Sequence, residues 1–325
     1  WTRRAGRAAR RDEPPRRRPG PVTGDDHPAG TQRWHPPAGR VGRVLLFADG
    51  AKARVSEVLA QVEAFLRTTG AELETVADLR GIDPCGGFTP SAQPDLVVVL
   101  GGDGSVLMAA RLLAAAPAPT IGVNFGRVGF LASLQAEQWR AGLQEILDGR
   151  GLVERRMRLT ATVVRAGRDA PDGPPIVALN DVVLSRGGSP TLVEFDLESR
   201  DRRVTSYRAD GLIFATPSGS TAYSLAAGGP ILDPALRAIL LTPISAHSLA
   251  HRPLVIGPRA ETSARITTCA GPVSLDVDGV SQSRLEAGDT VHVVAHEDPY
   301  PLLTTDGFDP WRRLRDRLGW SGAMG

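Results

Sequence analysis

Cysteine, lysine and long apolar runs are scarce in this sequence of 325 residues. Cys85 and Cys269 are the only cysteines, which excludes a disulfide framework and a four-cysteine zinc site and favours a reducing, cytoplasmic location. Lys52 is the only lysine and lies in GAKARV, which excludes the P-loop pattern GxxxxGK[ST]. No run approaches the roughly 18 uncharged apolar residues of a membrane helix. No apolar segment follows the arginine-rich start, so neither a membrane partner nor a signal peptide is expected.

Arginine and proline are concentrated near the start of the chain. Residues 1–43 hold eleven arginines, four acidic residues and seven prolines, whereas the remaining chain is net acidic. This composition predicts a disordered tail over residues 1–40. An arm for nucleic acid and a transit peptide are the less favoured alternatives, because prolines interrupt an amphipathic helix and no aromatic platform accompanies the arginines. No nucleic-acid partner is therefore expected.

Strands and helices alternate over residues 41–150. GRVLLFAD (42–49) is typical of a buried strand, and apolar residues then recur at spacings of three and four, as on one helix face. Further strands are expected at 71–77, at 95–100 and near PTIGVNFG, with helices over 105–115 and 136–147. The alternation predicts a doubly wound α/β domain with a parallel sheet.

The pattern changes after residue 151. Short alternating stretches separated by Gly, Pro and Asp predict an antiparallel, β-rich, sandwich-like domain over residues 151–305. The last segment, 306–325, contains DPWRRLRDRLGW and predicts a helix that packs back on the first domain. Its RRLRDR run is most simply a solvated helix face.

The loop GGDGS follows the expected strand at 95–100, where open α/β sheets bind ligands. Glycines at this place let backbone N–H groups approach phosphate oxygens, and the start of the next helix favours anions. Asp103 is unexpected in such a loop, because a carboxylate repels a phosphate. Its presence favours a function such as accepting a hydroxyl proton or holding Mg²⁺. The alternative is an ordinary strand-to-helix turn with a capping aspartate.

Four other polar groups are ambiguous from sequence alone. TPSGSTAYS (216–224) favours either a second ligand-binding turn or an ordinary capped helix start. Side-chain alternation places Arg208 and Asp210 on one side of a strand, either at a site or as a solvated pair. Asn124, Asn180 and Asp181 suit a base and a ribose as well as they suit turns. His247 and His251 have a metal-ligand spacing, but they lack the glutamate of HExxH, and a structural role or a place in an interface is favoured.

Taken together, these motifs resemble the NAD kinase family, also called ATP-NAD kinases, from about Gly42 to the end of the chain. The resemblance is carried by LGGDGSVLMAAR, GVNFGRVGFLA, LNDVVLSR, YRADGLIFATPSGSTAYSLAAGGPIL, AHSLAHRPLV, DVDG and RLRDRLGW. GGDG[ST] loops also occur in lipid kinases of the diacylglycerol type and in phosphofructokinases, whereas the long central string is much more specific.

The resemblance implies an NAD site between an α/β domain and a β-rich domain, and a reaction in which ATP phosphorylates the 2′-hydroxyl of the adenosine ribose of NAD. It assigns the proton acceptor to Asp103. The implied NAD-binding residues are Asp103, Gly104, Asn124, Asn180, Asp181, Arg208, Asp210, Thr221, Ala222, Tyr223 and Ser224. The donor phosphates would lie on Gly101, Gly102 and Gly104 with Mg²⁺, for which no protein ligand is predicted. A homodimer or homotetramer is implied, in which a neighbouring subunit completes the site.

This chain departs from the family pattern at three positions. Asp181 stands where glutamate is usual, Ser218 where threonine is usual, and Arg127 where histidine is frequent. The first two changes keep the chemical group, so the activity is still expected.

Two kinds of alternative function stay open at this stage. A lipid or sugar kinase would need an acyl groove or a basic sugar-phosphate pocket. A hydride-transferring oxidoreductase would need GxGxxG after its first strand, where this chain has ADGAKARV. A non-catalytic dinucleotide sensor would bind NAD and release no ADP.

Overall fold

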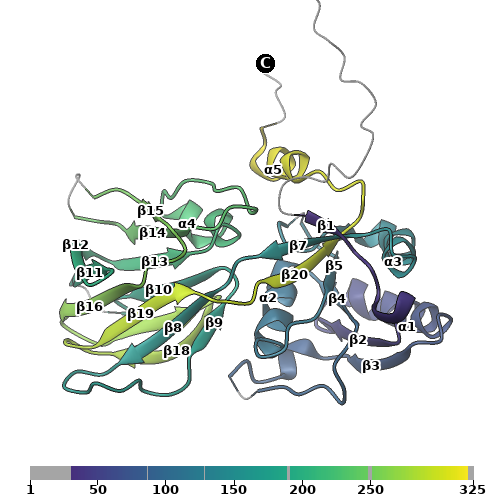
Figure 1. The fold of residues 1–325 in the computed structure, drawn as a ribbon, viewed down its shortest axis with the longest axis horizontal. Coiled ribbons are helices and arrows are strands. Elements are labelled where there is room, and N and C mark those ends of the chain that lie inside the picture. Colours follow the sequence, from purple (N-terminus) through teal and green to yellow (C-terminus); the bar gives the residue numbers. More distant parts are fainter. Residues whose placement is uncertain (1–30, 86, 128, 189–190, 248–250, 321–325) are drawn as a thin grey trace, which may run out of the picture.

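The computed structural model describes residues 31–320, apart from residues 86, 128, 189–190 and 248–250. Residues 1–30 of the expected tail and 321–325 of the last segment lie outside the described residues. An α/β domain and a β-sandwich lie side by side, and the helix α5 (Pro310–Leu318) lies above their junction in Figure 1. Among the described residues, no helix has both the length and the apolar character needed to cross a membrane.

One mixed sheet of eight strands forms the centre of the α/β domain. In spatial order it contains β1 (Thr31–Arg33), β7 (Leu152–Arg156), β20 (Tyr300–Thr304), β5 (Thr120–Asn124), β4 (Leu96–Gly101), β2 (Arg43–Ala48) and β3 (Glu72–Val76), while β6 (Leu134–Gln135) pairs with β5. The strands from β20 to β3 run parallel, and β7 is antiparallel to both β20 and β1. The expected parallel sheet is therefore present, with an antiparallel extension at one edge.

Helices cover both faces of this sheet. The α-helices are α1 (Ala53–Arg67), α2 (Asp103–Leu112) and α3 (Trp139–Leu147), and short 3-10 turns occur at η1 (Pro37–Gly39), η2 (Leu79–Gly81) and η3 (Ala136–Gln138). Phe65 of α1 and Leu143 of α3 pack in one apolar cluster, whereas Val106 and Ala109 of α2 pack in another. Because alternate residues of β2 and β4 enter the two clusters, both faces of these strands are buried.

The second domain is a sandwich of two six-stranded antiparallel sheets, as predicted. One sheet contains β15 (Leu254–Ile256), β14 (Ile239–Ile244), β13 (Gly211–Ala215), β10 (Asp181–Ser185), β17 (Val273–Val277) and β18 (Val280–Leu285). The other contains β12 (Arg202–Ala209), β11 (Val193–Ser199), β16 (Thr262–Thr268), β19 (Thr290–Ala295), β8 (Leu159–Val164) and β9 (Ile176–Ala178). Fully buried side chains such as Phe195 and Phe214 fill the space between them.

The structure differs from the expected domain boundaries at three places. β7 and β20, expected within the β-rich domain at 151–305, belong to the first sheet, because the chain returns to the α/β domain after the sandwich is complete. Residues 31–34, expected in the disordered tail, add β1 to the edge of that sheet. Trp34 is buried, and its indole N–H donates to the carbonyl of Ile146 at 3.2 Å. One buried aromatic side chain thus holds the end of a segment whose overall composition suggests disorder.

Candidate active site

The carboxyl ends of β2, β4 and β5 lie at one edge of the first sheet, as parallel pairing requires. The GGDG segment follows β4 and begins α2. Asn124 ends β5, and its buried amide bonds the loop that follows: Nδ2 donates to the carbonyl of Arg127 at 2.7 Å, and Oδ1 accepts from the N–H of Gly126 at 3.0 Å. In this structure Asn124 shapes the loop beside the GGDG segment.

The Asp103 carboxylate is clasped by that same loop. It accepts hydrogen bonds from the backbone N–H groups of Phe130 at 2.6 Å, Leu131 at 3.0 Å and Ala132 at 3.1 Å. A carboxylate offers about four lone-pair directions, so the clasp leaves about one of them for a ligand. Asp103 is therefore held in one orientation with limited, directed capacity to accept a further proton donor. We name this arrangement of Asp103 and residues 130–132 the clasp.

A basic cluster that the sequence patterns do not indicate lies beside the GGDG segment. The Lys52 ammonium is 3.6 Å from the carboxylate of Asp49, which is fully buried and also pairs with Arg80 at 2.8 Å. A methyl group added at Gly102 would lie 3.2 Å from Lys52 Nζ. The single lysine, excluded from a P-loop by its sequence context, thus reaches the GGDG backbone from the end of the neighbouring strand.

A cavity of about 560 Å³ gathers a second group of expected residues. Its lining includes Asn180, Asp181, Ala222 and Tyr223, which are far apart in the sequence. The ring of Tyr223 is about half exposed and free to contact a planar group. The volume falls within the roughly 300–1,000 Å³ of ordinary small-molecule sites.

Asn180 has a buried polar atom without a partner within the part of the chain that the structure describes. Its side-chain oxygen Oδ1 is buried and has no hydrogen-bond partner among the described residues. A buried amide oxygen without a partner costs roughly 1–3 kcal/mol, so such groups generally serve a ligand or a water. The backbone at this point is fixed by Asp278, whose carboxylate accepts from the N–H groups of Leu179, Asn180 and Asp181 at 2.7–3.1 Å.

The acid next to Asn180 holds a proton unusually tightly. Burial, and to a smaller extent the negative charge of Asp278, raises the pKa of Asp181 to about 7. The pKa of Asp278 is itself raised by burial, against the opposing effect of its three backbone hydrogen bonds. At neutral pH the Asp181 carboxyl is therefore partly protonated and is able to donate as well as accept a hydrogen bond.

This pKa predicts a particular pH dependence of stability. A buried acid whose pKa is raised above its ordinary value of 3.8 binds a proton in the folded state that the unfolded state has lost, so stability falls as pH rises from about 4 to about 7. We expect Asp181→Asn to remove this component, so the melting temperature of the wild type should fall more between pH 5 and pH 8 than that of the variant. Parallel melting profiles in differential scanning fluorimetry would contradict the raised pKa.

The cavity and the clasp are neighbours through α2. Leu107 lines the cavity and lies four residues after Asp103, so the two side chains share one face of the helix about 6 Å apart along its axis. Arg111, one further turn along, donates to the carbonyl of Val277 in the sandwich and ties α2 to the second domain. The same face of α2 thus carries Asp103 in the clasp and, one turn later, Leu107 in the cavity wall, although Asp103 itself does not line the cavity.

The residues of the turn at 216–224 lie in several different environments. It forms only η4 (Gly219–Thr221) and the four-residue α4 (Tyr223–Ala226), shorter than the expected helix. The hydroxyl of Ser224 is fully buried and bonds that of Thr242 at 2.7 Å, so it does not face a ligand here. Thr221 lines a different cavity, of about 340 Å³, between α5 and the two domains.

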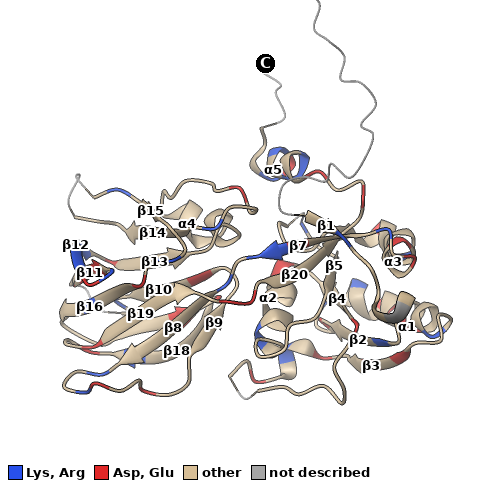
Figure 2. Cartoon of the chain, in the orientation of Figure 1, with Lys and Arg blue, Asp and Glu red and all other residues tan. Residues whose placement is uncertain are grey.

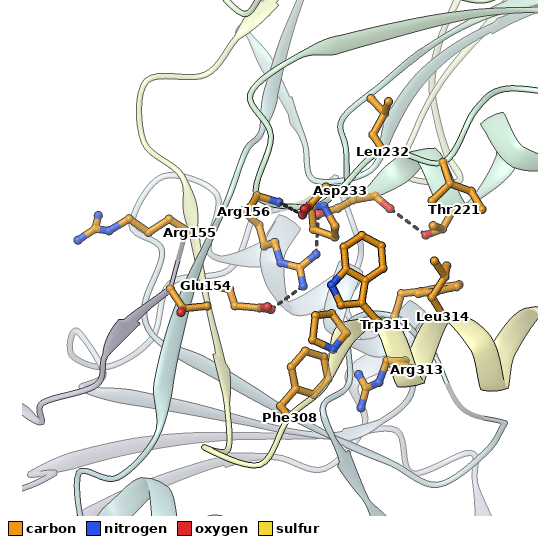
Figure 3. Close-up of a pocket in the computed structure, with 17 residues that line it drawn as sticks. Glu154, Arg155, Arg156, Thr221, Leu232, Asp233, Phe308, Trp311, Arg313 and Leu314 are labelled. Carbon is orange, nitrogen blue, oxygen red and sulfur yellow. Dashed lines mark hydrogen bonds and ion pairs between the residues drawn. The ribbon is translucent and has the colours of Figure 1, made fainter. Parts of the chain in front are cut away.

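Figure 3 shows that second cavity, in which Trp311 and Leu314 of α5 lie on the side of Leu232 and Thr221, whereas the Arg313 side chain points toward Phe308. Its far wall is β7, whose basic residues lie at the junction of the domains in Figure 2. The guanidinium of Arg156 there pairs with Glu154 at 2.5 Å and donates to the hydroxyl of Ser218 at 3.2 Å. Its charge is therefore balanced within the wall.

The structure does not bring Arg208 and Asp210 into either of these two cavities. β12 ends at Ala209 and β13 begins at Gly211 in the other sheet, so the chain crosses between sheets at Asp210, and the expected shared strand face is absent. Arg208 lies 3.7 Å from Glu194, and Asp210 pairs with Arg186 at 3.0 Å.

The described residues offer no protein-only metal site. No three His, Cys, Asp or Glu side chains in the described part of the chain converge in a way that could hold an ion. The ring of His251 packs edge-on against Tyr207, with 4.8 Å between centroids, which agrees with the structural role favoured for it.

Comparison with known proteins gives consistent results over both domains. Residues 49–151 match the model of the ATP-NAD kinase N-terminal domain, and residues 179–305 match that of the C-terminal domain. Among curated proteins, the chain is 42% identical to an NAD kinase of Nitrosospira multiformis over 71% of this chain and 77% of that protein. It is 40% identical to an NAD kinase of Gemmatimonas aurantiaca over 73% and 82%, respectively.

Solved structures have the same fold. The crystal structure of yeast NADH kinase with NADH aligns with a TM-score of 0.80 and 25% identity, covering 89% of this chain and 90% of that one. An Archaeoglobus fulgidus NAD kinase solved with ATP aligns with a TM-score of 0.64 and 23% identity, covering 85% and 97%.

Proposed function

Because this chain belongs to the ATP-NAD kinase family, we propose that it transfers the γ-phosphoryl group of ATP to the 2′-hydroxyl of the adenosine ribose of NAD. A bond forms between the 2′-oxygen and the γ-phosphorus, and the bond from that phosphorus to the β–γ bridging oxygen breaks. The products are ADP and NADP, and the hydroxyl proton passes to the enzyme.

The observation that carries the chemistry is the clasp. A ribose hydroxyl is far less acidic than a carboxylic acid, so we do not expect the hydroxyl to be fully deprotonated before phosphoryl transfer. In a loose transition state the attacking oxygen gains little charge, and alignment supplies most of the rate. Asp103, with three backbone donors fixing it and about one lone-pair direction free, orients the hydroxyl and accepts its proton late.

The coenzyme is assigned to the cavity that contains Asn180. The unpartnered Oδ1 of Asn180 is suited to accept from the exocyclic amine of adenine, and the ring of Tyr223 supplies an apolar face. Asp181, partly protonated at neutral pH, serves ribose hydroxyls as donor or acceptor. Ala222 completes this wall without a polar group.

The donor phosphates are assigned to Gly101, Gly102 and Gly104. Gly104 is exposed, with open space where a side chain would project, so an anion has room to approach the start of α2. Lys52 supplies a positive charge beside Gly102. Mg²⁺ enters with ATP as part of the substrate and neutralises phosphate charge, a mode of binding that needs few protein ligands.

Lys52 should matter for ATP and not for NAD. We expect Lys52→Met to raise the KM for ATP about tenfold or more, since one hydrogen bond to a charged group contributes roughly 1.5–3 kcal/mol, while the KM for NAD changes little. Lys52→Arg keeps the charge and is the matched control, expected to retain most of the affinity. Steady-state kinetics with each substrate varied in turn measures both; an unchanged KM for ATP in Lys52→Met would remove lysine from the donor site.

The reaction itself is tested by offering several acceptors side by side. We expect incubation with ATP, Mg²⁺ and NAD to yield NADP, detected with an NADP-specific dehydrogenase, together with ADP in equal amount. Diacylglycerol and fructose 6-phosphate are the acceptors of the alternative GGDG kinases and should yield none of their phosphorylated products. NAD binding without ADP release would instead indicate a sensor.

We also infer a homodimer or homotetramer in the cytoplasm. An oligomer accounts for Arg208 and Asp210, which line neither of the two cavities of one subunit, if they face the site of a neighbour. The two cysteines are unpaired, which suits a reducing compartment. Light scattering of the purified protein measures the oligomeric state.

A further inference from the structure

Arg313 of α5 is buried, although the sequence favours a solvated helix face for its segment. Only 8% of the residue is exposed. Its guanidinium donates from Nη1 to the carbonyl of Ala132 and from Nη2 to that of Ser133, both at 2.8 Å, and stacks over the ring of Phe308 at 4.6 Å. Figure 3 shows Arg313 beside Phe308 at the base of α5. A buried cation bound to two carbonyls and no carboxylate is costly to maintain.

The segment that Arg313 binds is the one that clasps Asp103. The N–H groups of Phe130, Leu131 and Ala132 point to the carboxylate, whereas the carbonyls of Ala132 and Ser133 point to the guanidinium. The backbone of residues 130–133 is therefore held between an anion on one side and a cation on the other. Ala132 contributes to both, through its N–H and its C=O.

The negative charge of Asp103 and the positive charge of Arg313 attract each other across this segment. Burial lowers the pKa of Arg313 to about 10, and the charge of Asp103 is the largest influence opposing that shift. Arg313 therefore stays charged at neutral pH. The carbonyls that Arg313 binds belong to the two peptide groups that follow the three N–H donors of the clasp, so Arg313 acts by fixing the position of the backbone next to those donors.

We propose that Arg313 is a positioning residue for phosphoryl transfer, which fixes residues 130–133 so that the clasp holds Asp103 in its reactive orientation. The inference rests on the proposed function, because it gives Arg313 a task only if Asp103 orients the acceptor hydroxyl. α5 contributes to turnover through this backbone segment and makes no contact with substrate. Displacement of a reacting group by about 1 Å costs up to about 100-fold in rate, which sets the scale of the effect.

The test compares Arg313→Ala and Arg313→Lys with the wild type. We expect Arg313→Ala to lower kcat about tenfold or more with little change in the KM for ATP. Lysine presents one ammonium where arginine presents a fork to two carbonyls, so Arg313→Lys should retain an intermediate kcat. Added guanidinium, at concentrations far below those that unfold proteins, should restore part of the activity of Arg313→Ala. Arg312→Ala, an exposed neighbour on α5, is the matched control and should behave as wild type.

The outcomes separate this inference from the proposed function. If the wild type makes no NADP, the proposed function fails. If the wild type makes NADP and the folded Arg313→Ala variant keeps its kcat, only the positioning role fails. A loss of kcat that follows the melting temperature and is not rescued by guanidinium indicates a merely structural role and also overturns the inference. Should Arg313→Ala not fold, Arg313→Lys decides, since a wild-type kcat in that variant contradicts the need for the fork.

Discussion

Asp103→Asn is expected to lower turnover by about 100-fold or more, the size of a general-base contribution, while NAD still binds. An amide accepts through one oxygen only, so the variant loses the proton acceptor and at least one of the three clasp hydrogen bonds. The cavity that contains Asn180 is unaltered. Steady-state kinetics gives kcat, and calorimetric titration with NAD in the absence of ATP gives the affinity.

A matched control separates chemistry from the loss of a carboxylate. Asp95 accepts two backbone hydrogen bonds, from Gly42 at 2.8 Å and Arg43 at 2.9 Å, at the opposite edge of the sheet. Asp95→Asn should keep the wild-type kcat. Turnover by Asp103→Asn within a few-fold of that control would remove Asp103 from the role of proton acceptor.

Gly129→Ala is expected to displace the Asp103 carboxylate from the position in which the clasp holds it. A methyl group built at Gly129 overlaps the Asp103 carboxylate, so the two cannot occupy the observed geometry together. The backbone of Gly129 does not need glycine for a positive φ, and the expected effect is therefore local displacement of Asp103. We expect kcat to fall about 100-fold, with NAD affinity changed much less.

The double variant tests whether Gly129→Ala lowers kcat through its effect on Asp103. Residues that act as one unit give strongly non-additive losses, so adding Gly129→Ala to Asp103→Asn should lower kcat little further. Gly257→Ala, which meets open space on an exposed loop, controls for the glycine substitution itself. Independent, multiplicative losses in the double variant would show that Gly129 acts on something other than Asp103.

Much of this arrangement could be predicted from the sequence. Apolar runs of the right length locate β2, β4 and β5, and the glycines after β4 mark the edge where ligands bind. Asn180 and Tyr223 meet in one cavity as the resemblance implies, although about 40 residues separate them in the sequence. Local pattern marks these positions because each residue lies directly beside a strand end or a tight turn, and the resemblance is what groups them into one site.

Other features depend on long-range packing that pattern does not encode. The sequence of β20 does not reveal that its strand returns to the first sheet, since only tertiary pairing with β5 and β7 decides this. The arginine run in α5 is polar enough to suggest solvent, yet Arg313 is buried and binds the carbonyls of Ala132 and Ser133, which lie far away in the sequence. The sequence context of Lys52 excludes a P-loop and indicates no other role, whereas parallel strand order brings its side chain to Gly102.

The most direct test of the central claim is a crystal structure with NAD bound and no phosphoryl donor. We expect adenine at Asn180 and the 2′-oxygen within about 2.6–3.2 Å of an Asp103 carboxylate oxygen, the reach of a proton acceptor. NAD bound in the cavity under α5, or a 2′-oxygen beyond hydrogen-bond distance of Asp103 while the clasp is intact, would contradict it.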